Sequence, residues 1–304
     1  MASRQRTPGR PFVSVSDALP TPSCGALAID PGNPNRIYLG SGDANSADTA
    51  IPARGFTFPR MQVRRAIKRP GEHALRRACR VHPENPQHVW VAAMGELPAT
   101  GGERDLFQRM TPARHGQRLA PSTIPTGASD VVVHPENPDI VYAAMRGSGC
   151  ATRVAARAGG RGSGIYKSAN RGETWTRLSV GMAPVADDVG RNGLAIAVQL
   201  RMSFMPATPI TRAFPWRLPS EDAGESWVRT NDESLTDAYS NFGWYFGNIR
   251  AARRRRHGLC AGSPAAHRPQ TAARWEEIAS NNAHVDHHAI WFDPQQPFRF
   301  LVGQ

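Results

Sequence analysis

The feature that most constrains the fold of this 304-residue chain is a repeat with a period of about 52 residues. Each copy contains an apolar stretch, a cluster of Pro and Asn, and a second stretch rich in Val, Ile, Tyr or Trp. The first proline of the cluster is Pro31, Pro83, Pro135 or Pro294, so the steps are 52, 52 and three times 53 residues. A fixed period of this length is the signature of an architecture built from repeated units.

The Pro/Asn cluster specifies a turn between two strands. Apolar and other residues alternate on either side of the cluster, which is the pattern of a half-buried strand. The prolines fix φ and cannot donate to a ladder, so the cluster joins neither strand. The Asn between them can accept a hydrogen bond from its own backbone. These residues are Asn33, Asn85 and Asn137.

A second motif follows in the same period, with the pattern Ser-x-Asp-x-Gly-x-Ser/Thr-Trp. Residues 220–227 fit it, and residues 168–175 fit it with Asn in place of Asp. We call this motif an Asp-box. It predicts a hairpin turn in which Asp or Asn accepts backbone N–H bonds, Gly supplies a positive φ and Trp packs against a neighbouring layer. The structural residues are Ser168, Asn170, Gly172, Trp175, Ser220, Asp222, Gly224 and Trp227.

Two hairpins in every period make one four-stranded sheet, which is the blade of a β-propeller. We therefore predict an all-β fold with residues 1–304 forming a single incomplete propeller of about five blades plus the start of a sixth. A β-sandwich is the alternative, but it does not explain the equal spacing of the same two turns.

The repeat is interrupted at five expected places. Asp-boxes are missing near residues 59, 110 and 270, and Pro/Asn turns are missing near residues 200 and 252. Arg-rich strings without strand alternation replace them, so we expect gaps, loops or poorly packed strands there. These disturbed segments lie near residues 57–80, 108–125, 199–219 and 251–272.

The genetic code offers a cause for these interruptions. The codons of Met61-Gln62-Val63, shifted by two bases, allow Asp-Ala-Gly, the centre of an Asp-box. Similar shifts of residues 109–116, 203–206 and 256–262 allow the other missing motifs. We therefore hypothesise compensating insertions and deletions that leave frameshifted segments between native ones, and this chain could then be a non-functional product. The alternative is a set of divergent blades with degenerate turns.

The motifs resemble those of secreted bacterial Asp-box (BNR-repeat) proteins described as glycosyl hydrolase-like, which are similar to sortilin-type and xyloglucanase-type propellers. The resemblance implies a fragment of a larger exported protein, secreted or periplasmic. The basic N-terminus of this chain is not followed by the apolar segment of a signal peptide. The residues that carry the resemblance are 28–45, 81–95, 129–145, 164–178, 220–230 and 284–294.

The composition argues against several other classes of protein. The net charge is +12, but 35 of the 37 basic residues are Arg, and no nucleic-acid-binding motif accompanies them, so we expect no nucleic-acid partner. No apolar run is long enough to span a membrane. The four Cys have no CxxC spacing, which supports neither a zinc site nor a disulfide framework. We predict no cofactor.

The densest polar cluster immediately precedes the last copy of the repeat. His284, Asp286, His287 and His288 are ligand types for metals, yet His287 would lie on the opposite side of a strand from the other three. We therefore predict a ligand-binding or hydrogen-bonded structural role and no metal site. Asp43 follows another copy of the repeat, and with Asp286 it is placed where a propeller displays its central site.

These residues leave the activity open. The leading interpretation is a scaffold that binds a peptide or a glycan across its face. The alternative is a glycoside hydrolase of xyloglucanase or sialidase-like type, which needs two carboxylates roughly 5–9.5 Å apart. No catalytic residue is identified, because no hydrolase motif is present and Asp222 is expected to serve the turn.

Overall fold

A computed structural model of the chain consists of strands, with no helix among the residues that it describes. The strands form six successive antiparallel sheets and one separate two-stranded ribbon, β1 (Ser3–Arg4) with β2 (Val13–Ser14). The described residues are 3–4, 13–14, 25–40, 56–59, 63–67, 76–94, 104–109, 117–118, 126–147, 162–180, 192–196, 202–206, 218–228, 248–251, 258–261, 266–269, 275–277, 289–293, 295–296 and 299–303.

Four of the six sheets have four strands, and in each of them every strand pairs with the next along the chain. Sheet 1 contains β3 (Ala26–Asp30), β4 (Asn33–Gly40), β5 (Phe56–Pro59) and β6 (Val63–Ile67). Sheet 2 contains β7 (Arg76–Val81), β8 (Val89–Met94), β9 (Arg104–Arg109) and β10 (Gln117–Arg118). Sheet 3 contains β11 (Thr126–Val133), β12 (Val141–Gly147), β13 (Gly164–Ser168) and β14 (Thr176–Leu178). Sheet 5 contains β18 (Asn248–Ala251), β19 (Gly258–Ala261), β20 (Ala266–Pro269) and β21 (Trp275–Glu277).

The other two sheets are smaller within the described residues. Sheet 4 contains β15 (Asn192–Ile196), β16 (Met202–Pro206) and β17 (Leu218–Ser220). Sheet 6 contains β22 (Ala289–Phe292) and β23 (Phe300–Gly303). Five larger sheets and a two-stranded sixth agree with the predicted five blades and the start of another.

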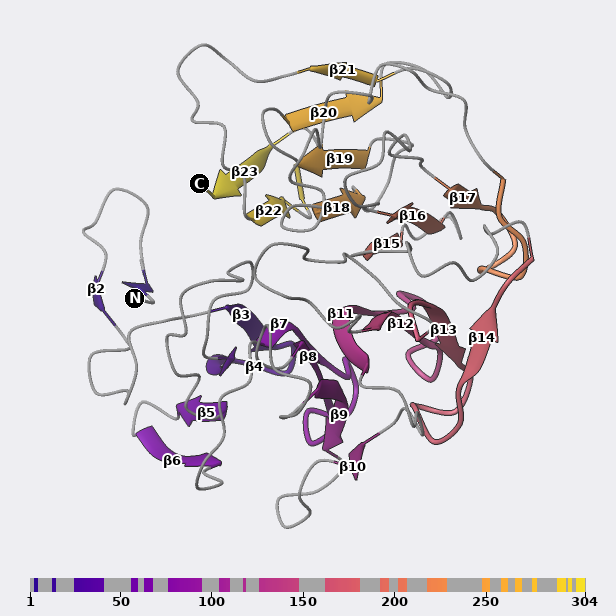
Figure 1. Ribbon diagram of the computed structural model, residues 1–304. Coiled ribbons are helices and arrows are strands. Elements are labelled where there is room, and N and C mark those ends of the chain that lie inside the picture. Colours follow the sequence, from indigo (N-terminus) through magenta and orange to yellow (C-terminus); the bar gives the residue numbers. More distant parts are fainter. Residues whose placement is uncertain are drawn as a thin grey trace, which may run out of the picture.

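The six sheets are arranged around a common centre, with their first strands innermost (Figure 1). The innermost strands β3, β7, β11, β15, β18 and β22 pack against one another in chain order. The predicted all-β propeller architecture is therefore confirmed.

The hydrophobic core lies between the faces of adjacent sheets. Trp90 and Tyr142, both fully buried, belong to the cores between sheets 2 and 3 and between sheets 3 and 4. Full burial of a large apolar side chain stabilises a fold by about 1.5–3 kcal/mol. Tyr38 packs with Val89 and Val91 between sheets 1 and 2. Sheets 1 to 4 are thus stabilised through their neighbours, as expected for a repeat architecture.

Strands are present inside all four disturbed segments. Strand β6 lies in the first, β10 in the second, β16 in the third, and β19 and β20 in the fourth. Strands β5 and β6, and strands β9 and β10, also pair antiparallel on either side of the expected positions of missing Asp-boxes. Pairing with a neighbouring strand can override a poor local pattern, because strand preference depends on context. The structure therefore preserves the period of the backbone where the motifs are lost.

No helix in the described part of the chain is long and apolar enough to cross a membrane.

Candidate functional site

The five residues that the sequence singles out for ligand binding lie outside the described residues. They are Asp43, His284, Asp286, His287 and His288. The nearest described strand ends are Gly40 of β4 and Ala289 of β22, and each lies at the end of its hairpin away from the Pro/Asn turn. Within the described ranges, no group of three or more His, Cys, Asp or Glu side chains could hold a metal ion.

Both Asp-box turns have the same set of hydrogen bonds. Ser168 Oγ accepts the N–H of Gly172 at 2.7 Å, and Asn170 Oδ1 accepts the N–H of Thr174 at 2.9 Å. The equivalent bonds in the second turn join Gly224 to Ser220 at 2.8 Å and Ser226 to Asp222 at 2.9 Å. Gly172 and Gly224 have φ of 94° and 87°, and Arg171 and Ala223, which precede them, are also left-handed. These are the roles expected of Asp or Asn and of Gly in such a turn.

Each Asp-box turn is attached to the preceding sheet by an aromatic side chain. Trp90 Nε1 donates to the carbonyl oxygen of Arg171 at 3.2 Å, and Tyr142 Oη donates to that of Ala223 at 2.7 Å. Both bonds join residues 81 positions apart, and both acceptors are the left-handed residues of the turns. An aromatic residue of one sheet therefore holds the Asp-box turn of the next sheet by a hydrogen bond.

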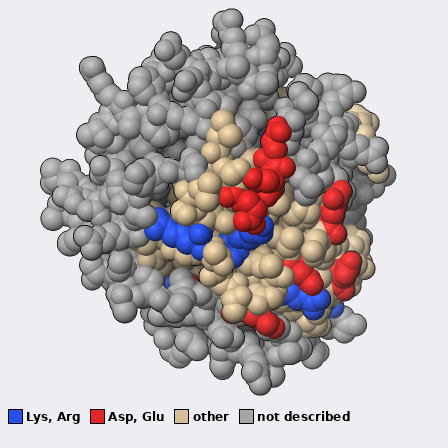
Figure 2. Space-filling model, turned by 90° about the vertical axis from the view of Figure 1, so that its right-hand side faces the viewer, with Lys and Arg blue, Asp and Glu red and all other residues tan. Residues whose placement is uncertain are grey.

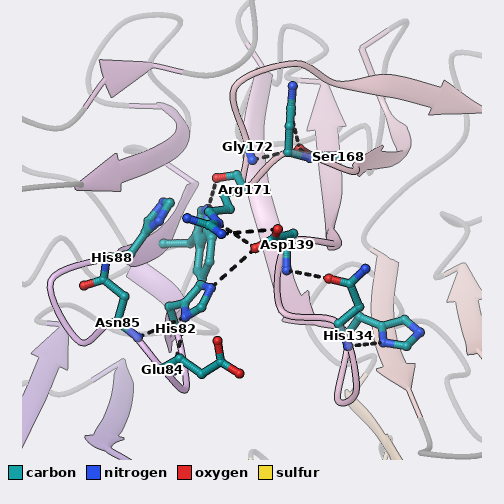
Figure 3. A network of polar contacts seen from close by, with 12 residues as sticks. His82, Glu84, Asn85, His88, His134, Asp139, Ser168, Arg171 and Gly172 are labelled. Carbon is teal, nitrogen blue, oxygen red and sulfur yellow. Dashed lines mark hydrogen bonds and ion pairs between the residues drawn. The ribbon is translucent and has the colours of Figure 1, made fainter.

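A polar network of His82, His88, Asp139 and Arg171 connects sheets 2 and 3 beside the Asp-box turn of sheet 3 (Figure 3). We call this network the joint. Asp139 pairs with Arg171 at 2.5 Å and lies 3.8 Å from Nε2 of His82. His82 Nδ1 accepts the N–H groups of Glu84 and Asn85 at 3.2 and 3.1 Å. Since Nδ1 is an acceptor, neutral His82 carries its proton on Nε2, which faces Asp139.

The electrostatics of the joint keep one of its histidines neutral. His88 stacks on Trp90 with ring centroids 4.3 Å apart and contacts the side-chain amide of Gln108. Burial lowers the pKa of His88 to about 4, with further lowering by His82 and Arg171. The hydrogen bond from Arg171 lowers the pKa of Asp139. Because these groups are directed at one another, the joint is best explained as an inter-sheet contact.

A second polar cluster lies among the innermost strands, and we call it the central cluster. Asp130 of β11 is buried, with 8% of its side chain exposed. Its Oδ1 accepts the N–H of Val131 at 2.9 Å, and its Oδ2 accepts the N–H of Leu194 on β15 at 3.3 Å. Innermost strands have a free inner edge, and its backbone groups need partners when they are buried. Asp130 supplies such a partner to two strands.

Two arginines complete the central cluster. Arg250 Nη1, from β18, lies 3.3 Å from Asp130 Oδ2 and also donates to the Ile249 carbonyl oxygen at 2.7 Å. Arg80 Nη1, from β7, donates to the Cys79 carbonyl oxygen at 2.8 Å. Strand β7 packs against β11, which places Arg80 near Asp130. Burial lowers the pKa of Arg80, Asp130 raises it and Arg250 lowers it. The cluster combines two positive charges with one negative charge.

The face of the molecule in Figure 2 shows no comparable concentration of one charge among the described residues. In Figure 2, acidic and basic side chains of the described residues lie beside one another. Lys167 of sheet 3, for example, forms an ion pair with Glu225 after sheet 4. The large excess of Arg in the sequence does not produce a basic patch on this face among the described residues.

The sequence did not single out the central cluster. Arg80, Asp130 and Arg250 come from three separate strands and do not occupy one position of the repeat. The only local signal is a charged residue inside a strand whose neighbours are apolar, as in Ser129-Asp130-Val131-Val132. Such a residue needs a partner when it is buried, but the sequence does not name the partner.

Comparison with known proteins supports the fold. No protein family and no curated protein matches the sequence. The structure is similar to the GH74 enzyme of Niastella koreensis, with TM-score 0.56 and 13% identity over 83% of this chain and 38% of the enzyme. It is also similar to an ancestral GH74 enzyme, with TM-score 0.59 and 15% identity over 91% of this chain and 37% of that one.

A third similar structure is YCF48 bound to D1 peptide, with TM-score 0.55 and 10% identity over 93% of this chain and 77% of that one. The chain therefore spans well under half of the length of the GH74 enzymes and most of the length of YCF48. At these identities the likeness concerns the fold alone, and that fold is the β-propeller.

Proposed function

We propose that this chain is an Asp-box propeller scaffold from an exported protein and that it binds a peptide or glycan ligand at the centre of its ring of sheets. The observation that carries the proposal is the central cluster. It places two guanidinium groups and one carboxylate where strands from three sheets converge. Polar groups gathered in this way give a ligand site its specificity.

Further support comes from exposure. The side chain of Arg250 is 30% exposed and Arg80 is partly exposed, whereas Asp130 is buried. A peptide as the class of ligand is supported by the similar YCF48 structure, which is described as bound to D1 peptide. In the joint, Asp139 and Arg171 are already paired with each other, so the joint has less capacity for a ligand.

Binding of the purified full chain to peptide and glycan arrays tests this function. We expect ligands that are retained by the wild type and lost or weakened in Arg250→Gln, because that variant removes an accessible donor at the centre. Glu173→Gln, on an exposed turn, is the matched control and should bind as the wild type does. The proposal is wrong if the folded chain retains no peptide or glycan on either array.

The alternative, a glycoside hydrolase, requires two carboxylates across one scissile bond. Among the innermost strands whose side chains are described, Asp130 is already ion-paired with Arg250, and Asp30 pairs with Arg36 beside a Pro/Asn turn. The likeness to GH74 enzymes is one of fold. We therefore expect no release of reducing sugar from xyloglucan, measured with the full chain at neutral pH.

A further inference from the structure

The central cluster has an excess of positive charge. Along the innermost strands, leaving aside the turn residue Asp30, the charged side chains that the structure describes are Arg80, Asp130 and Arg250. One carboxylate cannot neutralise two guanidinium groups. The remaining positive charge lies in partly buried surroundings, where electrostatic attraction is stronger than in water.

The cluster also has hydrogen-bond donors to spare. A guanidinium carries five N–H donors in a planar fork. In the described part of the structure, Arg80 donates to the Cys79 carbonyl, and Arg250 donates to Asp130 and to the Ile249 carbonyl. Both side chains use Nη1 for these bonds, which leaves their other nitrogens available for an acceptor. A planar fork of this kind matches a carboxylate.

Asp130 fixes the arrangement of the cluster. Its two oxygens are held by the N–H groups of Val131 and Leu194, so the carboxylate that orients Arg250 is itself anchored to two strands. Preorganised donors lose less entropy when they bind a ligand. We infer that Arg80 and Arg250 form a binding site for a ligand carboxylate and that Asp130 positions Arg250 and limits the affinity. This inference rests on the proposed binding function and names the chemical group that the site recognises.

Matched pairs of probes isolate the carboxylate. The first pair is a pooled random hexapeptide library with free C-terminal carboxylates and the same pool with C-terminal amides. The second pair is D-glucuronate and D-glucose, which tests a sugar carboxylate. Binding to the full chain is measured by calorimetric titration at low salt, and each variant is first checked for an unchanged circular-dichroism spectrum.

Three variants separate recognition from a structural role. Arg80→Gln removes one fork and should weaken binding of the carboxylate probe by about tenfold. Asp130→Asn keeps an oxygen acceptor but removes the competing negative charge, so it should tighten binding several-fold, whereas a purely structural Asp130 would give weaker or unchanged binding. Arg177→Gln is the control, because Arg177 lies on the outer strand β14 and donates to the Ser163 carbonyl.

The expected result is a preference of at least about fivefold for one carboxylate probe over its neutral partner, abolished in Arg80→Gln and preserved in Arg177→Gln. The peptide pair and the sugar pair show which source of carboxylate is used. Equal binding of charged and neutral probes overturns the inference but leaves the binding function intact. Binding of no probe also overturns it, and the array experiment then decides the binding function separately.

Discussion

At the scale of the residue, neighbouring sheets are joined by hydrogen bonds from the hydroxyl group of a Tyr or the indole N–H of a Trp. Tyr38, Trp90 and Tyr142 are spaced by 52 residues and occupy the same position of the repeat. Each is buried and each donates to a backbone carbonyl, with Pro86, Arg171 and Ala223 as acceptors. A buried carbonyl without a donor is costly, so the polar tip of the aromatic residue matters as well as its ring.

Removing the hydroxyl of Tyr142 should therefore destabilise the fold. In Tyr142→Phe the Ala223 carbonyl loses its donor at 2.7 Å, and we expect a loss of about 1 kcal/mol in unfolding free energy. Tyr166→Phe is the matched control, because the hydroxyl of Tyr166, which packs on the neighbouring core, has no hydrogen-bond partner among the described residues. Denaturant unfolding of both variants checks this. Equal losses in the two variants contradict the role of the hydroxyl.

His88 should make the stability depend on pH. Its pKa is lowered to about 4 in the folded protein, against an ordinary value of 6.5, so the unfolded chain binds its proton first as the solution is acidified. Stability is therefore lost as pH falls from 6.5 towards 4, by roughly 3 kcal/mol from this group. Burial also lowers the pKa of His134, which adds a change of the same sign.

Melting temperatures measured from pH 7 to pH 4 test the contribution of His88. His88→Gln removes the titrating group while keeping polar atoms near Gln108 and Trp90. The variant should have a lower melting temperature at pH 7 but a shallower decline on acidification. A decline as steep as that of the wild type would mean that other groups, such as His134, account for the pH dependence.

At the scale of the element, turns recur in two forms. In the Pro/Asn turn the residue before the first proline accepts N–H groups from within the turn, through a carboxylate oxygen in Asp30 and Asp293 and through Nδ1 in His82 and His134. Asp and neutral His can both occupy that position because each places a hydrogen-bond acceptor at a similar distance from its own backbone. The predicted self-bonding of the Asn is confirmed, with Asn137 Oδ1 accepting the N–H of Asp139 at 3.1 Å.

The Asp-box turn should be sensitive to its glycine. In Gly172→Ala the new Cβ would lie 2.7 Å from Gln108 Oε1 and 3.1 Å from Trp90 Nε1, at a φ of 94° that favours Gly. We expect a destabilisation of roughly 2 kcal/mol or more. Gly32→Ala, also in a turn, has its nearest neighbour at 3.5 Å and should cost under about 0.5 kcal/mol. Chemical denaturation measures the unfolding free energy of both variants. Equal unfolding free energies for Gly172→Ala and Gly32→Ala would disprove the explanation.

At the scale of the whole molecule, the disturbed segments raise the question of whether the six sheets unfold together. Sheets 2, 3 and 4 share continuous cores, and sheet 3 contains both an intact Pro/Asn turn and an intact Asp-box. If the frameshift hypothesis makes the chain a non-functional product, heating should give a gradual change without a cooperative transition. A cooperative β-rich transition in circular dichroism would count against that interpretation.

The nucleotide sequence tests the origin of the disturbed segments directly. We expect codons 55–80, 105–127, 199–219 and 250–272, read in shifted frames, to encode the missing Asp-boxes and strands. Codons that cannot yield those motifs would refute the frameshift hypothesis. Divergent blades would then explain why β6, β16 and β19 still lie at the phase of the repeat.

Much of the fold was predictable because its determinants are local and repeated. The Pro/Asn clusters and the Asp-box residues, such as Asn170 and Gly172, specify their turns through bonds within a few residues. A regular spacing of such turns leaves little choice except stacked four-stranded sheets. The sequence alone therefore determined the strand order, the period and the propeller architecture.

The tertiary structure alone decided which distant residues meet. The 81-residue contacts of Trp90 and Tyr142 and the meeting of Asp130 with Arg250, 120 residues apart, depend on how neighbouring sheets are placed around the centre. No local pattern encodes such pairs, because side-chain partners across sheets are selected by packing and by the need to satisfy buried polar groups. The sequence thus specified a ring of sheets, and the assembly of that ring created the central cluster.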